Sequence, residues 1–325
     1  MKPLSSSPHA AQQQVASARA TIGTFTPLAQ ASTERPRVGM IAGWGNFPLR
    51  VARALIDQGC DVYCLGVKDH ASDELRALCH TFQPVGLAKL GAAIRFFQRH
   101  QVQQATMAGK IHKVLLFRKL YWLKHLPDLT FVRHFYPHFV THSRDRKDDT
   151  ILGGMVDAFA SHGIHFAPAT DFAPELLVKY GQLSGGRLSH SQRKDIEFGW
   201  QLAREMGRLD VGQSVAVKGQ AVLAVEAVEG TDECIRRAGQ LCPAGGFTVV
   251  KVAKPQQDMR FDVPTVGLGT LEMMAAAGGR VLAIEAERTI LIDEADFIAR
   301  ANAAGISVVA VRDGQVAEDL PRQVA

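Results

Sequence analysis

The sequence has few cysteines, and their arrangement suits neither a zinc site nor a disulfide framework. There are 5 of them, namely Cys60, Cys64, Cys79, Cys234 and Cys242. Cys60 and Cys64 do not form a CxxC pair, and no paired His/Cys spacing follows them. A structural zinc or a set of disulfides is therefore not expected, and the cysteine usage favours a reducing compartment.

Long apolar runs are also absent. No run approaches the roughly 20 residues that cross a bilayer. Residues 1–36 are rich in Ala, Gln, Ser and Thr, and lack both helical and strand periodicity. They also lack the basic start and compact apolar stretch of a secretory signal. We expect a disordered extension over residues 1–36, with a transit or regulatory segment as the alternative.

A strong excess of one charge is missing as well. The chain has 37 basic against 32 acidic residues, which gives a formal net charge of +5. This balance favours anionic partners, such as phosphates and acidic lipid surfaces, without singling out nucleic acid. Its 325 residues are enough for two domains that each bury a core.

The first half of the sequence alternates between strand and helix patterns. Short apolar runs predict strands over 37–42, 61–67, 104–108 and 164–166, and helical periodicity predicts helices over 49–58, 72–79, 87–100 and 148–159. Such alternation implies parallel βαβ units. We therefore predict a Rossmann-like, doubly wound parallel sheet over residues 37–166.

The second half predicts a mixed α/β domain over residues 167–313, followed by a flexible tail over 314–325. A hairpin is expected over 215–225, turning at Gly219-Gln220. Further strands are expected over 247–253, 281–285, 287–292 and 307–311, and helices over 195–206, 232–240, 270–277 and 294–304.

A glycine loop follows the first predicted strand and precedes a helix. Its pattern, Gly43-x-Gly45-x-x-Pro48, is that of a dinucleotide loop in which Pro48 replaces the third glycine. Proline suits the first turn of a helix, and no acidic residue clearly ends the second strand. The glycines let backbone amides approach an anion. Three interpretations stay open: a nicotinamide or flavin site, a site for another phosphate-bearing ligand, or a plain tight turn.

Lys110 ends another strand of the same predicted sheet. The carboxyl ends of parallel strands form the ligand crevice of open α/β sheets. Lys110 is therefore expected to face the ligand above Gly43 and Gly45, or else to be a solvated loop lysine.

The stretch 113–139 is aromatic, leucine-rich and basic. Its composition fits core packing and helix–helix contact. It also fits contact with a membrane surface or an acyl chain, where basic residues accompany Trp and Tyr. Stacking on nucleic acid is a third, less fitting interpretation.

Two segments of the second half combine acidic and basic side chains. Asp232 follows Gly230-Thr231 at a strand-to-helix junction, where it can cap the helix or meet a metal–phosphate complex. Between residues 251 and 262, lysines and an arginine lie close to Asp258 and Asp262. A surface ion network is the alternative for this second segment. Together, the two segments suit a phosphate ester or a pyrophosphate with a divalent cation.

At these residues the chain resembles the LpxI family of UDP-2,3-diacylglucosamine pyrophosphatases, over nearly all of Val38 to about Val311. The motifs that carry the resemblance, in order, are Ile41-Ala42-Gly43-x-Gly45-x-Phe47-Pro48, Met107-Ala108-Gly109-Lys110, Asp210-Val211-Gly212-Gln213, Glu226 to Asp232, and Lys251 to Asp262. The first motif alone is weak, whereas the ordered set is specific.

The resemblance implies a cytoplasmic, peripheral enzyme of lipid A biosynthesis that hydrolyses UDP-2,3-diacylglucosamine to UMP and 2,3-diacylglucosamine 1-phosphate (lipid X). It also implies a requirement for Mg²⁺ and attack of water on the uridine-proximal phosphorus. Two domains that hold the lipid between them, a homodimer and transient contact with the membrane surface follow from the same resemblance. The family's essential aspartate matches Asp232.

We therefore expect Asp232 to be catalytic and to bind Mg²⁺, with Asp258 and Asp262 completing the metal shell. The expected substrate-binding residues are Gly43, Gly45, Asn46, Pro48, Lys110, Gln213, Thr231, Lys251, Lys254, Gln257 and Arg260. Two other classes stay open: an NAD(P)- or flavin-dependent oxidoreductase, and a non-catalytic lipid or nucleotide carrier. No nucleic-acid partner is expected.

Overall fold

The computed structural model of the protein describes residues 35–111, 126–140 and 148–317. Outside these residues lie the predicted extension up to residue 34, residues 112–125 with the first half of the aromatic and basic stretch, residues 141–147, and the end of the tail (318–325). Residues 37–325 belong to one compact unit. No helix among the described residues is both long enough and apolar enough to cross a membrane.

The first sheet is wholly parallel and has the strand order β3-β2-β1-β4-β5. Its strands are β1 (Arg37–Ala42), β2 (Asp61–Val67), β3 (Thr81–Val85), β4 (Gln104–Ala108) and β5 (His165–Phe166). In the central strand, Val38 pairs with Val62 on one side and with Gln104 on the other. The chain thus winds outward in both directions from β1, which confirms the doubly wound α/β prediction.

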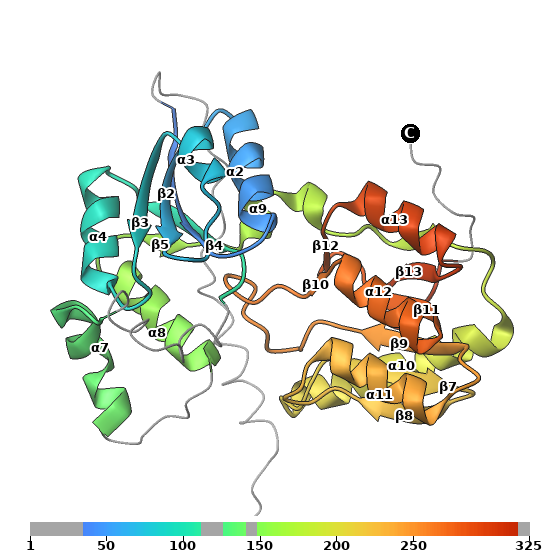
Figure 1. The fold of residues 1–325 in the computed structure, drawn as a ribbon. Coiled ribbons are helices and arrows are strands. Elements are labelled where there is room, and N and C mark those ends of the chain that lie inside the picture. Colours follow the sequence, from blue (N-terminus) through green and yellow to red (C-terminus); the bar gives the residue numbers. More distant parts are fainter. Residues whose placement is uncertain (1–34, 112–125, 141–147, 318–325) are drawn as a thin grey trace, which may run out of the picture. The chain divides into compact units, whose positions relative to one another are not determined.

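Helices cover both faces of this sheet, and Figure 1 shows α2 and α4 on opposite sides of it. The helices are α2 (Phe47–Asp57), α3 (Glu74–Leu78), α4 (Leu90–Arg99), α7 (Leu129–Val140), α8 (Asp148–Ala160) and α9 (Ala169–Phe172). The core on the α4 side contains Phe97, Phe135 and Phe159, each almost fully buried. Burial of such aromatic side chains is a main source of stability for this half of the chain.

The second sheet is mixed and has the order β6-β13-β11-β9-β7-β8. Its strands are β6 (Gly181–Ser184), β7 (Ser214–Lys218), β8 (Ala221–Val225), β9 (Phe247–Lys251), β11 (Gly279–Glu285) and β13 (Ser307–Val311). The three central strands β9, β11 and β13 are parallel, whereas β6, β7 and β8 run antiparallel to their neighbours. The predicted mixed α/β architecture is therefore confirmed.

Two hydrophobic clusters lie between the second sheet and the helices that cover it. The covering helices are α10 (His190–Arg208), α11 (Thr231–Leu241), α12 (Leu268–Ala277) and α13 (Glu294–Ala303). Ile196 and Trp200 of α10 belong to one cluster, and Ile235 of α11 and Phe297 of α13 belong to the other. A 3-10 turn (Pro174–Leu176) and a parallel pair of short strands, β10 (Thr265–Val266) and β12 (Ile290–Leu291), complete the described elements.

Two local predictions differ from the structure, and some elements lie where none was predicted. The predicted strand over 287–292 is wrong in extent, because Glu287 has a φ of 60° and only Ile290–Leu291 are extended and paired. Helix α10 begins before the predicted 195, since Ser189 and Gln192 form a capping box at its start. Strand β3 was not predicted; it lies at the sheet edge, where Pro84 is tolerated.

Candidate functional site

A pocket of about 320 Å³ gathers side chains from the ends of both sheets, and we call it the lysine pocket. Its polar lining residues are Lys110, Gln213, Glu226, Thr231, Lys251, Asp262 and Thr265. Trp44, Phe47, Phe261 and Ile292 are among its apolar residues. Of the predicted substrate-binding residues, Gly45, Lys110, Gln213, Thr231 and Lys251 thus lie around one cavity.

Lys110 reaches this pocket because two loops of the first sheet are joined by backbone hydrogen bonds. The N–H of Trp44 donates to the Lys110 carbonyl at 2.8 Å, and the N–H of Lys110 donates back at 3.0 Å. A Cβ atom at Gly43 would lie 2.7 Å from the Lys110 carbonyl oxygen, so only glycine permits this approach. The Gly43 N–H itself donates to the Ala108 carbonyl at 2.7 Å. Close backbone packing thus explains why glycine stands at position 43. Gly43 also lines a neighbouring apolar pocket, and its predicted contact with substrate stays a prediction.

Pro48 and Asn46 also have structural partners. Pro48 is a buried residue at the start of α2, and a Cβ atom at Gly109 would lie 2.8 Å from its ring. Asn46 donates a long hydrogen bond of 3.4 Å to Asp293. Neither residue lines the lysine pocket, so their predicted contact with substrate stays a prediction.

The centre of the pocket is a hydrogen-bonded group of Lys251, Thr231 and Glu226. Lys251 Nζ donates to Thr231 Oγ1 at 3.2 Å and to the Thr265 carbonyl at 3.1 Å. The Thr231 hydroxyl in turn donates to Glu226 Oε1 at 3.1 Å. The Lys251 ammonium has three N–H bonds. Two of them have partners among the described residues, so the third can serve a ligand in the pocket.

Sheet topology brings these residues together. Lys251 ends β9, and β7 runs antiparallel to it with Ser214 opposite Lys251. Glu226 follows directly after β8, the next strand along. Gly212 lets the chain pass close to Glu226, since a Cβ atom there would clash with the Glu226 carbonyl. Thr231 opens α11 and faces the same edge.

Burial dominates the electrostatics of Lys251, which is only 7 % exposed. Loss of solvation lowers the pKa of its ammonium below the ordinary 10.5. Glu226 opposes this shift, Lys110 adds to it, and Asp232 and Asp262 oppose it more weakly. A buried cation with a lowered pKa, surrounded by three carboxylates and a second lysine, is the kind of perturbed group that marks functional sites.

Asp232, the predicted catalytic residue, lies in the first turn of α11 and is exposed. Its carboxylate accepts a hydrogen bond of 3.1 Å from the Thr270 hydroxyl. Asp232 does not line the lysine pocket itself, although its neighbour Thr231 does. Its charge still acts on Lys251, so the two groups belong to one electrostatic site.

Hydrogen bonds and an ion pair among further predicted site residues hold the loop that follows β9. Gln257 is buried and donates to Asp262 Oδ2 at 2.6 Å, and it accepts from the Lys254 N–H at 2.9 Å. The Lys254 ammonium pairs with Asp210 at 2.7 Å. These contacts hold the loop that presents Asp262 and Phe261 to the pocket.

Arg260 and Asp258 form an ion pair with one another in the same loop. Arg260 Nε lies 2.9 Å and 3.0 Å from the two Asp258 oxygens. Burial tends to raise the pKa of Asp258, but the hydrogen bonds from Arg260 outweigh it and lower the pKa. Lys254, Gln257, Asp258 and Arg260 do not line the lysine pocket, and their proposed ligand contacts stay predictions.

The carboxylates around the pocket fit a Mg²⁺ ion that is held partly by substrate. Among the described residues, no three His, Cys, Asp or Glu side chains converge as a ready metal cage. Magnesium in nucleotide sites is commonly bound by one or two carboxylates together with phosphate oxygens and water. Glu226, Asp232 and Asp262 all lie near enough to Lys251 to act on its charge, and they are hard oxygen donors of the right kind.

An apolar pocket of about 110 Å³ adjoins the lysine pocket and shares Met107, Gly109 and Phe261 with it. It lies at the carboxyl ends of the first-sheet strands. Its further lining includes Val67, Val85, Leu90, Ile111 and Leu152. A charged pocket and an apolar pocket with common walls suit a ligand that has a phosphate head and an apolar tail.

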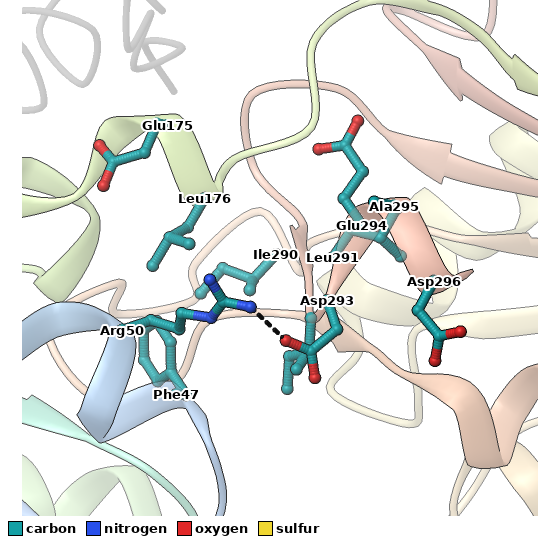
Figure 2. A pocket seen from close by; sticks show the side chains of 11 residues that line it. Phe47, Arg50, Glu175, Leu176, Ile290, Leu291, Asp293, Glu294, Ala295 and Asp296 are labelled. Carbon is teal, nitrogen blue, oxygen red and sulfur yellow. Dashed lines mark hydrogen bonds and ion pairs between the residues drawn. The ribbon is translucent and has the colours of Figure 1, made fainter. Parts of the chain in front are cut away.

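A third pocket, of about 530 Å³, lies on the other side of Phe47 and Ile292, and we call it the acidic pocket. Figure 2 shows Arg50 directed at Asp293, which it contacts at 2.6 Å, while Glu294 and Asp296 point elsewhere. The hydrogen bond from Arg50 lowers the pKa of Asp293. With its one arginine already paired, this pocket offers little attraction to phosphate.

Comparison with known proteins agrees with these observations. Residues 37–176 match the family model of the LpxI N-terminal domain, and residues 179–309 match that of the LpxI C-terminal domain. The chain belongs to the LpxI family. A relative from Caulobacter vibrioides, named UDP-2,3-diacylglucosamine pyrophosphatase LpxI, is 29% identical over 282 residues, which cover 85% of this chain and 97% of the relative.

The LpxI domain models meet between residues 176 and 179, after the 3-10 turn Pro174–Leu176. The boundary expected from the sequence, between 166 and 167, stays a prediction, since residues 37–325 form one compact unit. The LpxI resemblance inferred from the sequence motifs is confirmed.

Glu226 and Phe261 line the pocket but were not predicted as site residues from the sequence. Glu226 was part of a quoted motif, but its importance depends on the pairing of β7 with β9, which no local pattern reveals. Phe261 lies between Arg260 and Asp262, and only its charged neighbours were predicted as site residues. An aromatic residue inside a charged loop was the available signal for it.

Proposed function

We propose that this chain hydrolyses the pyrophosphate bond of UDP-2,3-diacylglucosamine, giving UMP and 2,3-diacylglucosamine 1-phosphate. The observation that carries the proposal is the buried Lys251, linked through Thr231 to Glu226 and facing Lys110 in one pocket. The adjoining apolar pocket and the name of the Caulobacter relative support the choice of a lipid-linked nucleotide sugar.

Lys251 and Lys110 have the role of offsetting phosphate charge. A pyrophosphate diester resists water because its negative oxygens repel the nucleophile. Fixed cations in a site of low dielectric constant reduce this repulsion, and they stabilise the charge that develops in the transition state. Thr231 positions Lys251 by accepting a hydrogen bond from its ammonium group. Glu226 orients the Thr231 hydroxyl by accepting a hydrogen bond from it.

Asp232 has the role of binding Mg²⁺ or orienting the attacking water, with Asp262 as a second candidate ligand. The ion, when bound, withdraws charge from the phosphate oxygens. Water attacks the phosphorus nearer the uridine in this proposal. The bond from that phosphorus to the bridging oxygen breaks, and the bridging oxygen leaves with the lipid sugar phosphate.

The remaining expectations are part of the same proposal. We propose a homodimer that works in the cytoplasm and makes transient contact with the inner membrane surface, where a diacyl substrate resides.

The test is turnover of purified protein with UDP-2,3-diacylglucosamine and Mg²⁺. We expect release of UMP and lipid X, and loss of that release when EDTA removes the metal. Substrate binding without UMP release would instead favour a lipid or nucleotide carrier. Bound flavin absorbance or a change in nicotinamide fluorescence, again without UMP, would favour an oxidoreductase.

A further inference from the structure

Thr270 contacts the proposed catalytic carboxylate, and it is not among the site residues predicted from the sequence. Its hydroxyl donates a hydrogen bond of 3.1 Å to Asp232 Oδ1, although the two residues lie 38 positions apart. Within the part of the chain that the structure describes, no other group is hydrogen-bonded to this carboxylate. The Thr270 hydroxyl is therefore placed to set the orientation of the Asp232 side chain.

Two packed helices hold these residues beside one another. Asp232 lies in the first turn of α11, and Thr270 lies in the first turn of α12. Further along, a Cβ atom at Gly239 of α11 would lie 2.7 Å from the carbonyl oxygen of Ala277 in α12. Both helices also contribute side chains to the same core cluster. Because the helices meet near both ends, their starts are fixed relative to one another.

The backbone at Thr270 is fixed as well. The N–H of Thr270 donates to the Gly267 carbonyl at 3.1 Å, which closes a tight first turn of α12. The side chain of threonine is branched at Cβ, so rotation about χ1 is restricted. The hydroxyl is thus presented by a rigid element, as precise placement of a partner requires.

The segment that leads into α12 also contacts Lys251. Lys251 Nζ donates to the Thr265 carbonyl at 3.1 Å, and Thr265–Val266 continue through Gly267 into the helix. Residues 265–270 therefore contact both the buried cation of the lysine pocket and the proposed catalytic anion. A single short segment supports the two charged groups.

We propose that Thr270 is a positioning residue for the proposed hydrolysis and acts through Asp232. The inference rests on the proposed function, because it gives Asp232 the role stated there. A carboxylate has several acceptor sites on its two oxygens. By donating to Oδ1, the Thr270 hydroxyl holds the side chain in one orientation and leaves Oδ2 for the metal ion or the attacking water. The alternative is a purely structural contact that joins α11 to α12.

The test compares Thr270→Val with Thr270→Ser in the full chain. Valine keeps the shape of threonine but cannot donate a hydrogen bond, whereas serine keeps the hydroxyl. Turnover of UDP-2,3-diacylglucosamine is measured with Mg²⁺. Thr270→Val should lower kcat about tenfold, because removal of a hydrogen bond to a charged group has an effect of this order. The substrate Kd should change little. Thr270→Ser should have a kcat close to that of the unaltered chain.

The matched control is Glu272→Gln, at an exposed residue of the same helix. It should leave kcat unchanged. Measuring Tm for each variant separates loss of positioning from loss of packing. If Thr270 only joins the two helices, Thr270→Val should lower Tm and leave kcat unchanged, and that result would overturn the proposal. Equal kcat values for Thr270→Val and Thr270→Ser would overturn it too.

Crystal structures of the variants give a measurement that does not depend on turnover. The Asp232 carboxylate should keep its position in Thr270→Ser and in Glu272→Gln, and should turn away from α12 in Thr270→Val. An unmoved Asp232 in Thr270→Val would contradict the proposal whether or not the chain hydrolyses the substrate. Absence of UMP release from the unaltered chain would instead count against the proposed function.

Discussion

The lysine pocket and the acidic pocket share Phe47 and Ile292 as walls, yet their chemistry is opposite. The acidic pocket is the larger, at about 530 Å³ against about 320 Å³. Its carboxylates, those of Glu175, Asp293, Glu294 and Asp296, outnumber its single arginine. The lysine pocket instead combines two lysines with buried hydrogen-bonding partners.

Charge and burial favour the lysine pocket as the proposed phosphate site, although the acidic pocket has the larger volume. Arg50 is already paired with Asp293, and both side chains are substantially exposed, so this ion pair is screened by solvent. Lys251 is held in a nearly dry setting, where its charge acts strongly on a ligand. The predictions below test whether activity follows this contrast.

The largest expected effect is that of Asp232→Ala. Loss of a residue that holds the metal or the water should lower kcat by about 10²–10⁴-fold, with the substrate Kd little changed. Glu233→Ala is the matched control, because Glu233 lies in the same helical turn and pairs with Arg236. Steady-state kinetics and calorimetric binding provide the measurement. Equal activities of the two variants would remove Asp232 from the mechanism.

The second-largest effect is expected for Lys251→Met. This change should lower kcat/KM by about 10²–10³-fold, as does removal of other fixed donors to a developing anion. Lys254→Met is its control within the same segment, since Lys254 pairs with Asp210 outside the lysine pocket. The kcat/KM of that control should fall about fivefold or less, since a partly exposed ion pair contributes little. A larger loss at Lys254 than at Lys251 would contradict this account.

A smaller effect is expected in the pH profile. In the proposed mechanism the protonated form of Lys251 is active, and burial lowers the pKa of its ammonium below 10.5. The kcat/KM value should therefore fall as pH rises through that lowered pKa. Glu226 is the main carboxylate that opposes the shift, so Glu226→Gln should lower the pKa further and move the falling limb to lower pH. A limb that moves to higher pH would mean that another group titrates.

The smallest effect is expected in the acidic pocket. Glu294→Gln should change kcat/KM by about twofold or less, as is usual for surface substitutions away from a site. The same kinetic assay measures it. A loss comparable with that of Lys251→Met would show that the larger pocket takes part in the reaction.

Local patterns in the sequence predicted much of the fold, and some of the site. Alternating strands and helices are enough to infer that Gly43 and Lys110 share the carboxyl edge of a parallel sheet, and their loops are indeed hydrogen-bonded. Asp262 and Thr231, placed near Lys251 in the sequence analysis, line the same pocket as Lys251.

The rest depends on contacts between distant residues. The link from Lys251 to Glu226 needs the antiparallel pairing of β7 with β9 and β8, and the partner of Lys254 is Asp210, 44 residues away. Sequence proximity does not show that Lys254 pairs with Asp210 or that Arg260 pairs with Asp258, and the predicted ligand contacts of these residues stay predictions. Strand β3 was missed because Pro84 is unfavourable except on an edge strand.

The most direct test of the central claim is hydrolysis of UDP-2,3-diacylglucosamine with Mg²⁺ in ¹⁸O-water, read by mass spectrometry of both products. The account predicts that UMP carries the label and that lipid X does not. Label in the lipid phosphate, or no release of UMP at all, would contradict it.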